Sequence, residues 1–146
     1  MAKVKKISID SDSVCYGPMP KPEDEVFQHL TINAQGRVWL SRYCFGNGFH
    51  EYYLKSKAIL FIGAEKAKKI LDAVEAYYRD EKITKMFVTD VGSWTAVIVL
   101  DNDECVGDNG TLISDNGKLH QISEQIRTAL NDNTVFAFDC HYDEED

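Results

Sequence analysis

The chain has 146 residues, a formal net charge of −8, 44% hydrophobic residues and 27% charged residues. This length suits one domain, and the composition is that of an ordinary globular protein. The longest apolar runs, over residues 58–62 and 95–100, are far too short to cross a bilayer, and the basic start has no apolar stretch like that of a signal peptide. We therefore expect a soluble cytoplasmic protein that does not bind membranes.

The negative charge is concentrated toward the carboxyl end. Residues 1–100 carry 14 Lys/Arg and 12 Asp/Glu, whereas residues 101–146 carry 2 Lys/Arg and 12 Asp/Glu. Four of these acids lie in residues 141–146, which we expect to form a disordered acidic tail after a single domain over residues 1–140. Others cluster in the segment DNDECVGDNG, as Asp101, Asp103, Glu104 and Asp108. This asymmetry indicates either an acidic binding surface or a charge that serves solubility alone.

The four cysteines, Cys15, Cys44, Cys105 and Cys140, are widely spaced and include no CxxC pair. Their spacings to neighbouring histidines match no zinc finger or zinc ribbon. In a reducing compartment such cysteines are expected to be free thiols. We predict that the protein holds no metal and no cofactor.

The first 62 residues predict β-strands. Alternation of polar and apolar residues predicts a strand over residues 3–9, and a loop with three prolines follows it. Two β-rich runs, 26–32 and 37–45, flank the turn NAQG and predict a hairpin. Aromatic and branched residues over 49–62 predict one or two further strands.

Two later segments predict amphipathic helices. Over residues 64–80 the apolar residues recur with the 3.6-residue period of a helix, at Ala67, Ile70, Leu71, Val74, Tyr77 and Tyr78. The second helix is predicted by the apolar residues Leu119, Ile122, Ile126, Ala129 and Leu130. Each stripe is expected to face the core.

The remaining segments predict more strands. Residues 86–89 and 94–100 form a second predicted hairpin, and because 94–100 is apolar throughout we expect it to be covered on both faces. Two copies of Asp-Asn-Gly, at 108–110 and 115–117, predict tight turns around a short strand over 111–114, and 134–140 predicts a closing strand. Most connections are too short for crossovers, so we predict an α+β fold with a mostly antiparallel sheet and both helices packed on one face.

The stretch His29-Leu30-Thr31-Ile32 matches the His-apolar-Ser/Thr-apolar signature that the two-histidine phosphoesterases carry twice. On a strand, His29 and Thr31 share one face, as phosphate chemistry requires. Those enzymes need a second copy, and no other histidine of this chain is followed two residues later by Ser or Thr. We therefore expect an ordinary polar strand face and no catalytic residue, and a phosphodiesterase or hydrolase ranks third among the functional hypotheses.

The acids near residue 101 suggest a calcium loop, but their spacing does not fit one. An EF-hand loop that began at Asp101 would need Gly at its sixth position and Glu at its twelfth, where this chain has Val106 and Leu112. We expect a hairpin loop here.

Residues 37–57 interleave aromatic with basic side chains. By the two-residue period of a strand, Trp39, Tyr43 and Phe45 share a face with Arg37. Aromatic residues and Arg often dominate the binding energy of protein–protein interfaces. We predict that these four residues bind a partner.

The sequence therefore predicts a small non-enzymatic protein that acts by protein–protein interaction and does not bind nucleic acid directly. The alternative is an acidic inhibitor, in which Asp101, Asp103, Glu104 and Asp108 imitate the phosphates of a nucleic acid and block a nucleic-acid-binding or defence protein. The sequence leaves the oligomeric state open.

Overall fold

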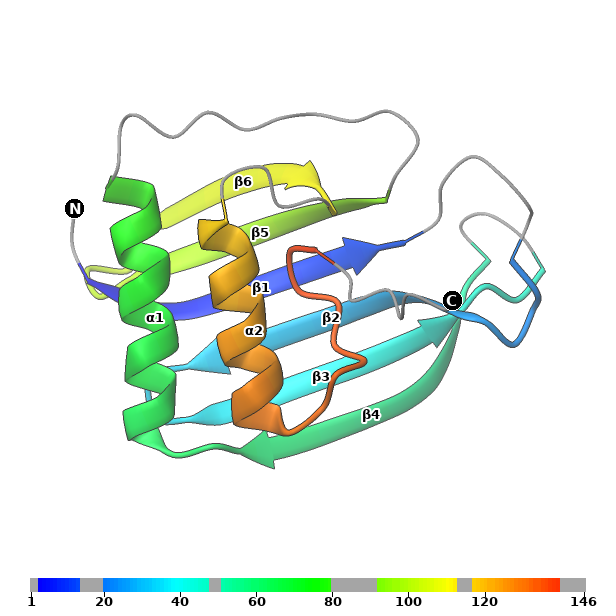
Figure 1. Ribbon diagram of the computed structural model, residues 1–146, viewed down its shortest axis with the longest axis horizontal. Coiled ribbons are helices and arrows are strands. Elements are labelled where there is room, and N and C mark those ends of the chain that lie inside the picture. The colour runs from blue at the N-terminus through cyan, green and yellow to red at the C-terminus, as the bar shows by residue number, and fades with distance from the viewer. Residues whose placement is uncertain (1–2, 14–19, 48–50, 80–91, 113–116, 140–146) are drawn as a thin grey trace.

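The computed structural model describes residues 3–13, 20–47, 51–79, 92–112 and 117–139. In it, six strands form one antiparallel sheet with two helices beside it (Figure 1). The strands are β1 (Val4–Asp12), β2 (Glu25–Asn33), β3 (Arg37–Cys44), β4 (Tyr53–Phe61), β5 (Ser93–Leu100) and β6 (Cys105–Thr111). Helix α1 (Ala64–Arg79) follows β4, and helix α2 (Lys118–Leu130) follows β6. The order across the sheet is β4-β3-β2-β1-β5-β6. The predicted α+β class is confirmed.

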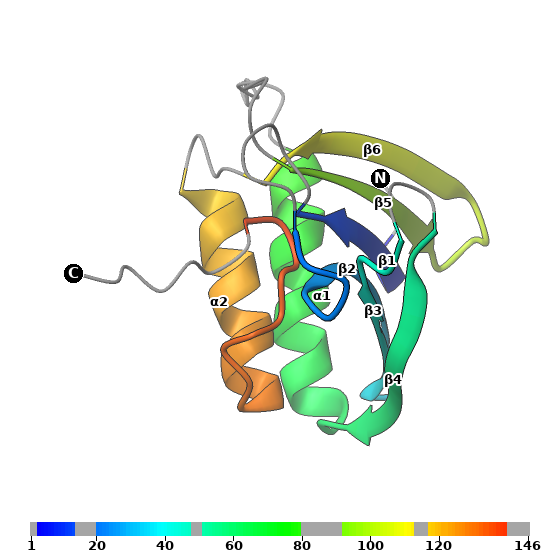
Figure 2. The ribbon, with the colours of Figure 1, turned by 90° about the vertical axis from the view of Figure 1, so that its right-hand side faces the viewer.

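Both helices lie on the same face of the sheet (Figure 2). Alternate strand residues point toward them and are buried, as Ile9 of β1 and Ile32 of β2 show with no exposed surface. The predicted helical stripes face the same core and are buried: Ala67, Ile70, Leu71, Val74 and Tyr77 of α1, and Leu119, Ile122 and Ile126 of α2. Both predicted helices are therefore confirmed. In the described part of the chain, neither helix is long and apolar enough to span a membrane.

The hairpin of β2 and β3 confirms the predicted turn NAQG. The Asn33 side-chain oxygen accepts hydrogen bonds from the backbone N–H groups of Gln35, at 3.1 Å, and Arg37, at 3.0 Å. Gly36 has a φ of 92°, and a Cβ there would overlap the backbone of Gly63, which precedes α1. Glycine is therefore required where this turn meets the start of the helix.

Strands β5 and β6 differ from the expectation in two respects. Only one face of β5 is covered, because its residues alternate between buried and exposed and Val97 is 47% exposed. The Asp-Asn-Gly copy at 108–110 lies inside β6 and forms no turn. Gly110 is instead directly opposite Trp94, whose ring lies 2.7 Å from where a Cβ would stand, so glycine makes room for a buried indole. Of the predicted strand over 111–114, Thr111 is the last residue of β6 and Leu112 belongs to no strand. Residues 113–114 and the predicted strand over 86–89 lie outside the described residues.

The predicted closing strand over 134–140 is wrong across its described part, 134–139, which joins no sheet. Helix α2 ends at Leu130, and the chain turns back after it (Figure 1), with a positive φ of 52° at Asn131. The segment 131–139 then crosses the helix-side face of β3, β2 and β1, and Val135, Ala137 and Phe138 are buried. Those three strands already pair with a neighbour on each side. No strand edge is therefore available to the segment, and a β-rich sequence is left irregular.

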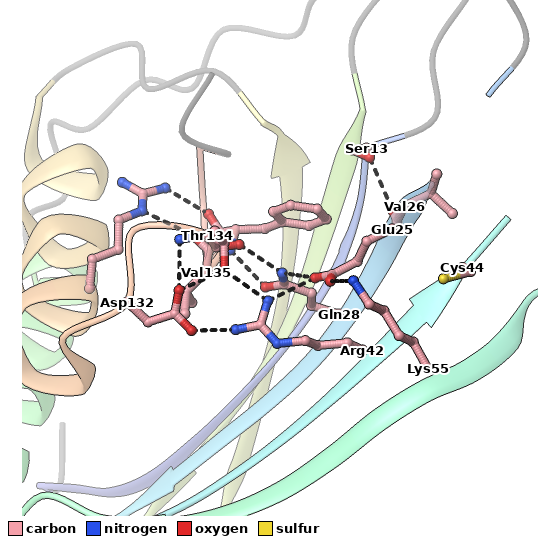
Figure 3. Close-up of polar contacts among 12 residues, drawn as sticks. Ser13, Glu25, Val26, Gln28, Arg42, Cys44, Lys55, Asp132, Thr134 and Val135 are labelled. Atoms are coloured by element: carbon pink, nitrogen blue, oxygen red, sulfur yellow. Dashed lines mark hydrogen bonds and ion pairs between the residues drawn. The ribbon is translucent and has the colours of Figure 1, made fainter. Parts of the chain in front are cut away.

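Side chains, in place of a strand ladder, hold this segment to the sheet (Figure 3). The buried Gln28 donates to the carbonyl of Thr134, at 2.8 Å, and accepts from the N–H of Phe136, at 2.7 Å. Arg42 lies between two carboxylates, 2.9 Å from Glu25 and 2.5 Å from Asp132. The Gln28 contacts satisfy backbone groups of the segment that would otherwise be buried without partners, and the Arg42 ion pairs join the segment to the sheet through side chains.

Arg127 of α2 holds the same segment from the other side. Its side chain is 1% exposed, and its guanidinium donates to the carbonyls of Val135, at 2.8 Å, and Phe136, at 3.1 Å. It also forms ion pairs with Asp139 and Glu124, each at 2.8 Å. A buried charge is tolerated only when it is paired and hydrogen-bonded in this way.

We predict that Ile126→Asp unfolds the domain or nearly so, and that Ile70→Asp does the same. Ile126 has no exposed surface, and a carboxylate there would lack a compensating partner. The expected loss is at least about 4 kcal/mol of unfolding free energy, measured by urea denaturation. Gln125→Asp, one position away on the exposed side of α2, is the control. Cooperative melting of both core variants near the parent temperature would show that the helix faces are misassigned.

We predict that Arg127→Met lowers the unfolding free energy by about 3 kcal/mol or more, because it removes the guanidinium that donates to the Val135 and Phe136 carbonyls and to the buried Asp139 carboxylate. His120 still pairs with Asp139, and the N–H of Asp139 still donates to the Phe136 carbonyl, so the Val135 carbonyl loses most. Arg79→Met removes an exposed cation from an i,i+4 pair with Glu75 and should cost less than about 0.5 kcal/mol. Equal losses in the two variants would contradict a special role for the buried guanidinium.

Candidate functional site

The face of the sheet that points away from the helices is covered by neither of them (Figure 2). We call it the open face. The strand register arranges its side chains in rows that cross the sheet. One row runs from β4 to β5 and consists of Ile59, Trp39, Thr31, Ser8 and Val97. The next row begins with Phe61 and Arg37.

The start of these two rows forms an exposed patch of aromatic, apolar and basic side chains. Trp39 is directly opposite Ile59, and Arg37 is directly opposite Phe61. Ile59 is 67% exposed and Phe61 is 75% exposed. The Arg37 guanidinium lies 5.9 Å from the centre of the Trp39 ring, a cation–π distance. We call Arg37, Trp39, Ile59 and Phe61 the aromatic patch.

The structure separates the four predicted binding residues. Arg37 and Trp39 belong to the aromatic patch, and Tyr43 lies farther along β3, where its ring packs edge-on against Phe27 at 5.6 Å. Phe45 follows the end of β3, is 3% exposed and packs 6.0 Å from Tyr52. Its ring therefore belongs to the interior and cannot contact a partner without local unfolding.

Tyr52 lies close to Phe27, near the start of β2. Its ring lies 6.1 Å from Phe27, and its hydroxyl donates to a carboxylate oxygen of Asp12 at 3.1 Å. Burial and the neighbouring Asp12 carboxylate raise the pKa of the Tyr52 hydroxyl to about 12. The hydroxyl therefore stays protonated and remains a donor at physiological pH.

A polar network occupies the middle of the open face. His29 Nδ1 pairs with Asp10, which lies directly opposite on β1, and His29 Nε2 lies 3.4 Å from Thr31 Oγ1. The Thr31 hydroxyl is in turn 2.9 Å from the hydroxyl of Ser8. Carboxylate, imidazole and hydroxyl thus follow one another in the order found in nucleophilic triads.

Two features of this network disfavour catalysis. The distance of 3.4 Å between His29 and Thr31 exceeds the reach of about 2.6–3.2 Å expected for a general base. Both strands that carry the network, β1 and β2, are flanked by strands on each side, so their backbone N–H groups belong to the sheet and do not form an oxyanion hole. The Asp10 and His29 side chains are each 44% exposed, as expected for a polar stripe within a binding surface.

The predicted acidic cluster does not form one surface. Asp101, Asp103 and Glu104 are exposed in the turn between β5 and β6, where Lys5 pairs with Asp103 and lowers the pKa of its carboxyl. Asp108 instead lies on β6 and points toward α1, where it accepts a hydrogen bond of 2.7 Å from Tyr78. Burial and this carboxylate raise the pKa of the Tyr78 hydroxyl.

Other features of the described residues do not involve the predicted site. A groove of about 550 Å³ runs between α1 and α2, and its lining includes Lys66, Lys69, His120 and Glu124. It lies on the helix layer, on the opposite side from the open face. Of the described cysteines, Cys44 is buried and Cys105 is exposed, and both are free thiols. Within the described ranges, no three His, Cys, Asp or Glu side chains gather as metal ligands.

Sequence reasoning missed Ile59 and Phe61. The run Ala58-Ile-Leu-Phe-Ile62 is apolar throughout and therefore indicates a buried strand. Ile59, Leu60 and Phe61 are nevertheless exposed on β4, the last strand of the sheet, a position that local sequence does not encode. Ser8 and Asp10 were missed for a similar reason, since only strand pairing brings them beside Thr31 and His29.

We predict that His29→Ala changes the unfolding free energy by less than about 1 kcal/mol, because exposed ion pairs contribute little. Thermal melting checks this, with Thr31→Val as a comparison that removes the buried member of the network. Hydrolysis of bis-p-nitrophenyl phosphate should stay at the buffer rate for both the parent and His29→Ala. A parent activity that disappears in His29→Ala would contradict the non-catalytic interpretation.

Comparison with known proteins assigns this surface to no family. No protein-family model matches the chain, and no curated protein matches it in sequence. The use of the open face therefore has to be inferred from its own residues and geometry.

Proposed function

We propose that this protein is a non-enzymatic binding protein that contacts a protein partner through the aromatic patch. The observation that carries the proposal is the exposure of Ile59 and Phe61 beside Trp39 and Arg37, on a sheet face that the helices leave open. Exposed apolar side chains are ordinary when they are scattered, but a contiguous group on one surface is typical of an interaction site.

The chemistry of the patch suits a protein partner. Rings such as Trp39 and Phe61 offer a large contact area and lose little conformational entropy on binding, because few side-chain torsions are restrained. Arg37 supplies directed donors beside the Trp39 ring, which makes this pair a candidate binding hot spot. The strands β3 and β4 hold both residues on a paired backbone, so the surface is largely preorganised.

The acidic alternative has weaker support. A mimic of nucleic acid needs several carboxylates spread along one exposed surface. Asp108 points toward α1 and Asp103 is paired with Lys5, so the four predicted acids do not present a common array. The enzyme hypothesis has weaker support still, because His29 and Thr31 lie on internal strands without nearby donors for an oxyanion.

We place this binding in the cytoplasm. The chemistry of the cysteines agrees with a reducing compartment, since the exposed Cys105 is a free thiol among the described residues.

We predict that Trp39→Ala weakens partner binding by about 2 kcal/mol or more, roughly 30-fold in Kd, with little dependence on salt. The partner is first captured by the parent chain from extracts of its native host and is then titrated against each variant by calorimetry. Val97→Ala is the matched control, because it truncates a half-exposed apolar side chain in the same row as Trp39 but three strands away, on β5.

A second variant tests the alternative against the same partner. Asp101, Asp103, Glu104 and Asp108 are neutralised together as Asp→Asn and Glu→Gln, and binding is measured at two salt concentrations. The proposal predicts nearly unchanged affinity. Binding that survives Trp39→Ala but collapses in the neutralised variant and at high salt would establish the acidic surface as the contact instead.

A further inference from the structure

The outer edge of β4 carries backbone hydrogen-bonding groups that no strand among the described residues pairs with. The N–H of Ile62 donates to the carbonyl of Gly36, at 2.8 Å, which makes these two residues a hydrogen-bonded pair. Such pairs alternate along an antiparallel ladder, so Leu60 and Ala58 also direct their backbone groups toward β3. Lys57, Ile59 and Phe61 therefore direct their N–H and C=O groups away from β3, and in the described part of the chain β4 is the last strand on that side.

The side chains of this edge are unusually apolar. Among the described residues six large hydrophobic side chains are exposed, and five of them lie on β4: Tyr53, Leu54, Ile59, Leu60 and Phe61. Native proteins commonly protect sheet edges with lysine, proline or very short strands. β4 has nine residues and carries lysines only at Lys55 and Lys57, so its second half is unprotected.

The sequence of β4 is complementary to itself in one antiparallel register. With Ile59 on a twofold axis, Ile59 pairs with Ile59 of a second copy, and Lys57 pairs with Phe61 on either side. All of these residues have outward-directed backbone groups, so the pairing uses them as hydrogen-bonded pairs. The ammonium of each Lys57 would then lie beside an aromatic ring, where a cation is favourable.

Only the register centred on Ile59 pairs all three outward-directed residues with one another. Centring on Ala58 would bring Phe61 opposite Lys55, at the irregularity in the pairing of β4 with β3, and centring on Leu60 would bring Lys57 opposite Gly63, beyond the end of β4, where φ is 88°. A centre at Lys57 is unfavourable as well. With Lys57 on the axis, the two Lys57 side chains would be directly opposite each other, and like charges in that position are destabilising. It would also place Ile59 opposite Lys55, at the irregularity where β4 departs from regular pairing with β3. Charge and register thus select Ile59 as the centre.

We propose that two copies of this chain associate through β4, in an antiparallel pairing with Ile59 on the twofold axis. The two six-stranded sheets would join into one continuous sheet of twelve strands. Both open faces would then lie on the same side, with Trp39 of each copy one strand away from the junction. The pairing does not depend on whether the aromatic patch also binds another protein.

Cysteine cross-linking tests the register. In a background with Cys15, Cys105 and Cys140 changed to Ser, Ile59→Cys places one thiol opposite its symmetry mate. Hydrogen-bonded pairs have Cα atoms about 5.5 Å apart, within the range of about 4.4–6.8 Å that a disulfide spans. Mild oxidation should convert most of this variant to a covalent dimer. A mixture of Lys57→Cys and Phe61→Cys chains should yield the mixed dimer.

The controls use single thiols that the register keeps apart. Two Lys57→Cys residues would be about 13 Å apart along the strands, and Val97→Cys is half-exposed but far from the edge, so neither alone should cross-link. Efficient cross-linking of Lys57→Cys alone would overturn the proposed register. Equal cross-linking of Val97→Cys would show random collision and overturn the pairing.

Light scattering tests the association itself without cysteines. The parent chain should have twice the mass of one chain at micromolar concentrations, and Ile59→Lys should have the mass of one chain. Ile59 is 67% exposed, so this change should leave the melting temperature of the fold nearly unchanged, apart from the loss of dimer stabilisation. Val97→Lys is the matched control and should stay dimeric. A parent chain of single mass, or an Ile59→Lys chain of double mass, would contradict the proposal.

Discussion

The rest of the structure depends on the burial of one face of the sheet beneath a single layer of helices. Two helices do not cover six strands completely, and the segment 131–139 fills the remaining part of that face. Its backbone has no strand to pair with, so buried polar side chains supply the missing partners. Arg127 from the helix layer and Gln28 from the sheet satisfy this segment from opposite sides.

This arrangement explains why buried polar residues occur in an otherwise apolar core. Ser11, Gln28, Ser123 and Arg127 are each at most 1% exposed, and each contacts a backbone group of the segment. An unsatisfied buried backbone group costs about 1–3 kcal/mol, so these side chains are required by the path of the chain and are not signs of catalysis. The same reasoning applies to the ion pairs of Arg42 at the rim of this region (Figure 3).

The one-sided core has a second consequence, for the outer surface. Since the helix layer takes one face, the other face and the outer strand β4 are left to the solvent or to partners. The two surfaces meet at Ile59 and Phe61, whose side chains belong to the open face and whose backbone groups belong to the edge. Recognition by side chains and recognition by strand pairing can therefore operate on adjacent parts of one surface.

Local sequence determined the elements whose signals are periodic or depend on one turn. The stripe from Ala67 to Tyr77 predicted α1, and Asn33 with Gly36 predicted the hairpin of β2 and β3, because a helix face and a tight turn depend on residues within a few positions of each other. The residues Arg37 and Trp39 were also predicted to share one face, since the two-residue period of a strand is a local property.

Tertiary structure alone decided the rest. It buried Phe45, made Gly110 a packing partner of Trp94, left Thr134 to Asp139 without a strand edge, and exposed Ile59 at the end of the sheet. Each of these outcomes depends on which strands become neighbours, and strand order is set by contacts between residues far apart in the chain, which no local pattern encodes.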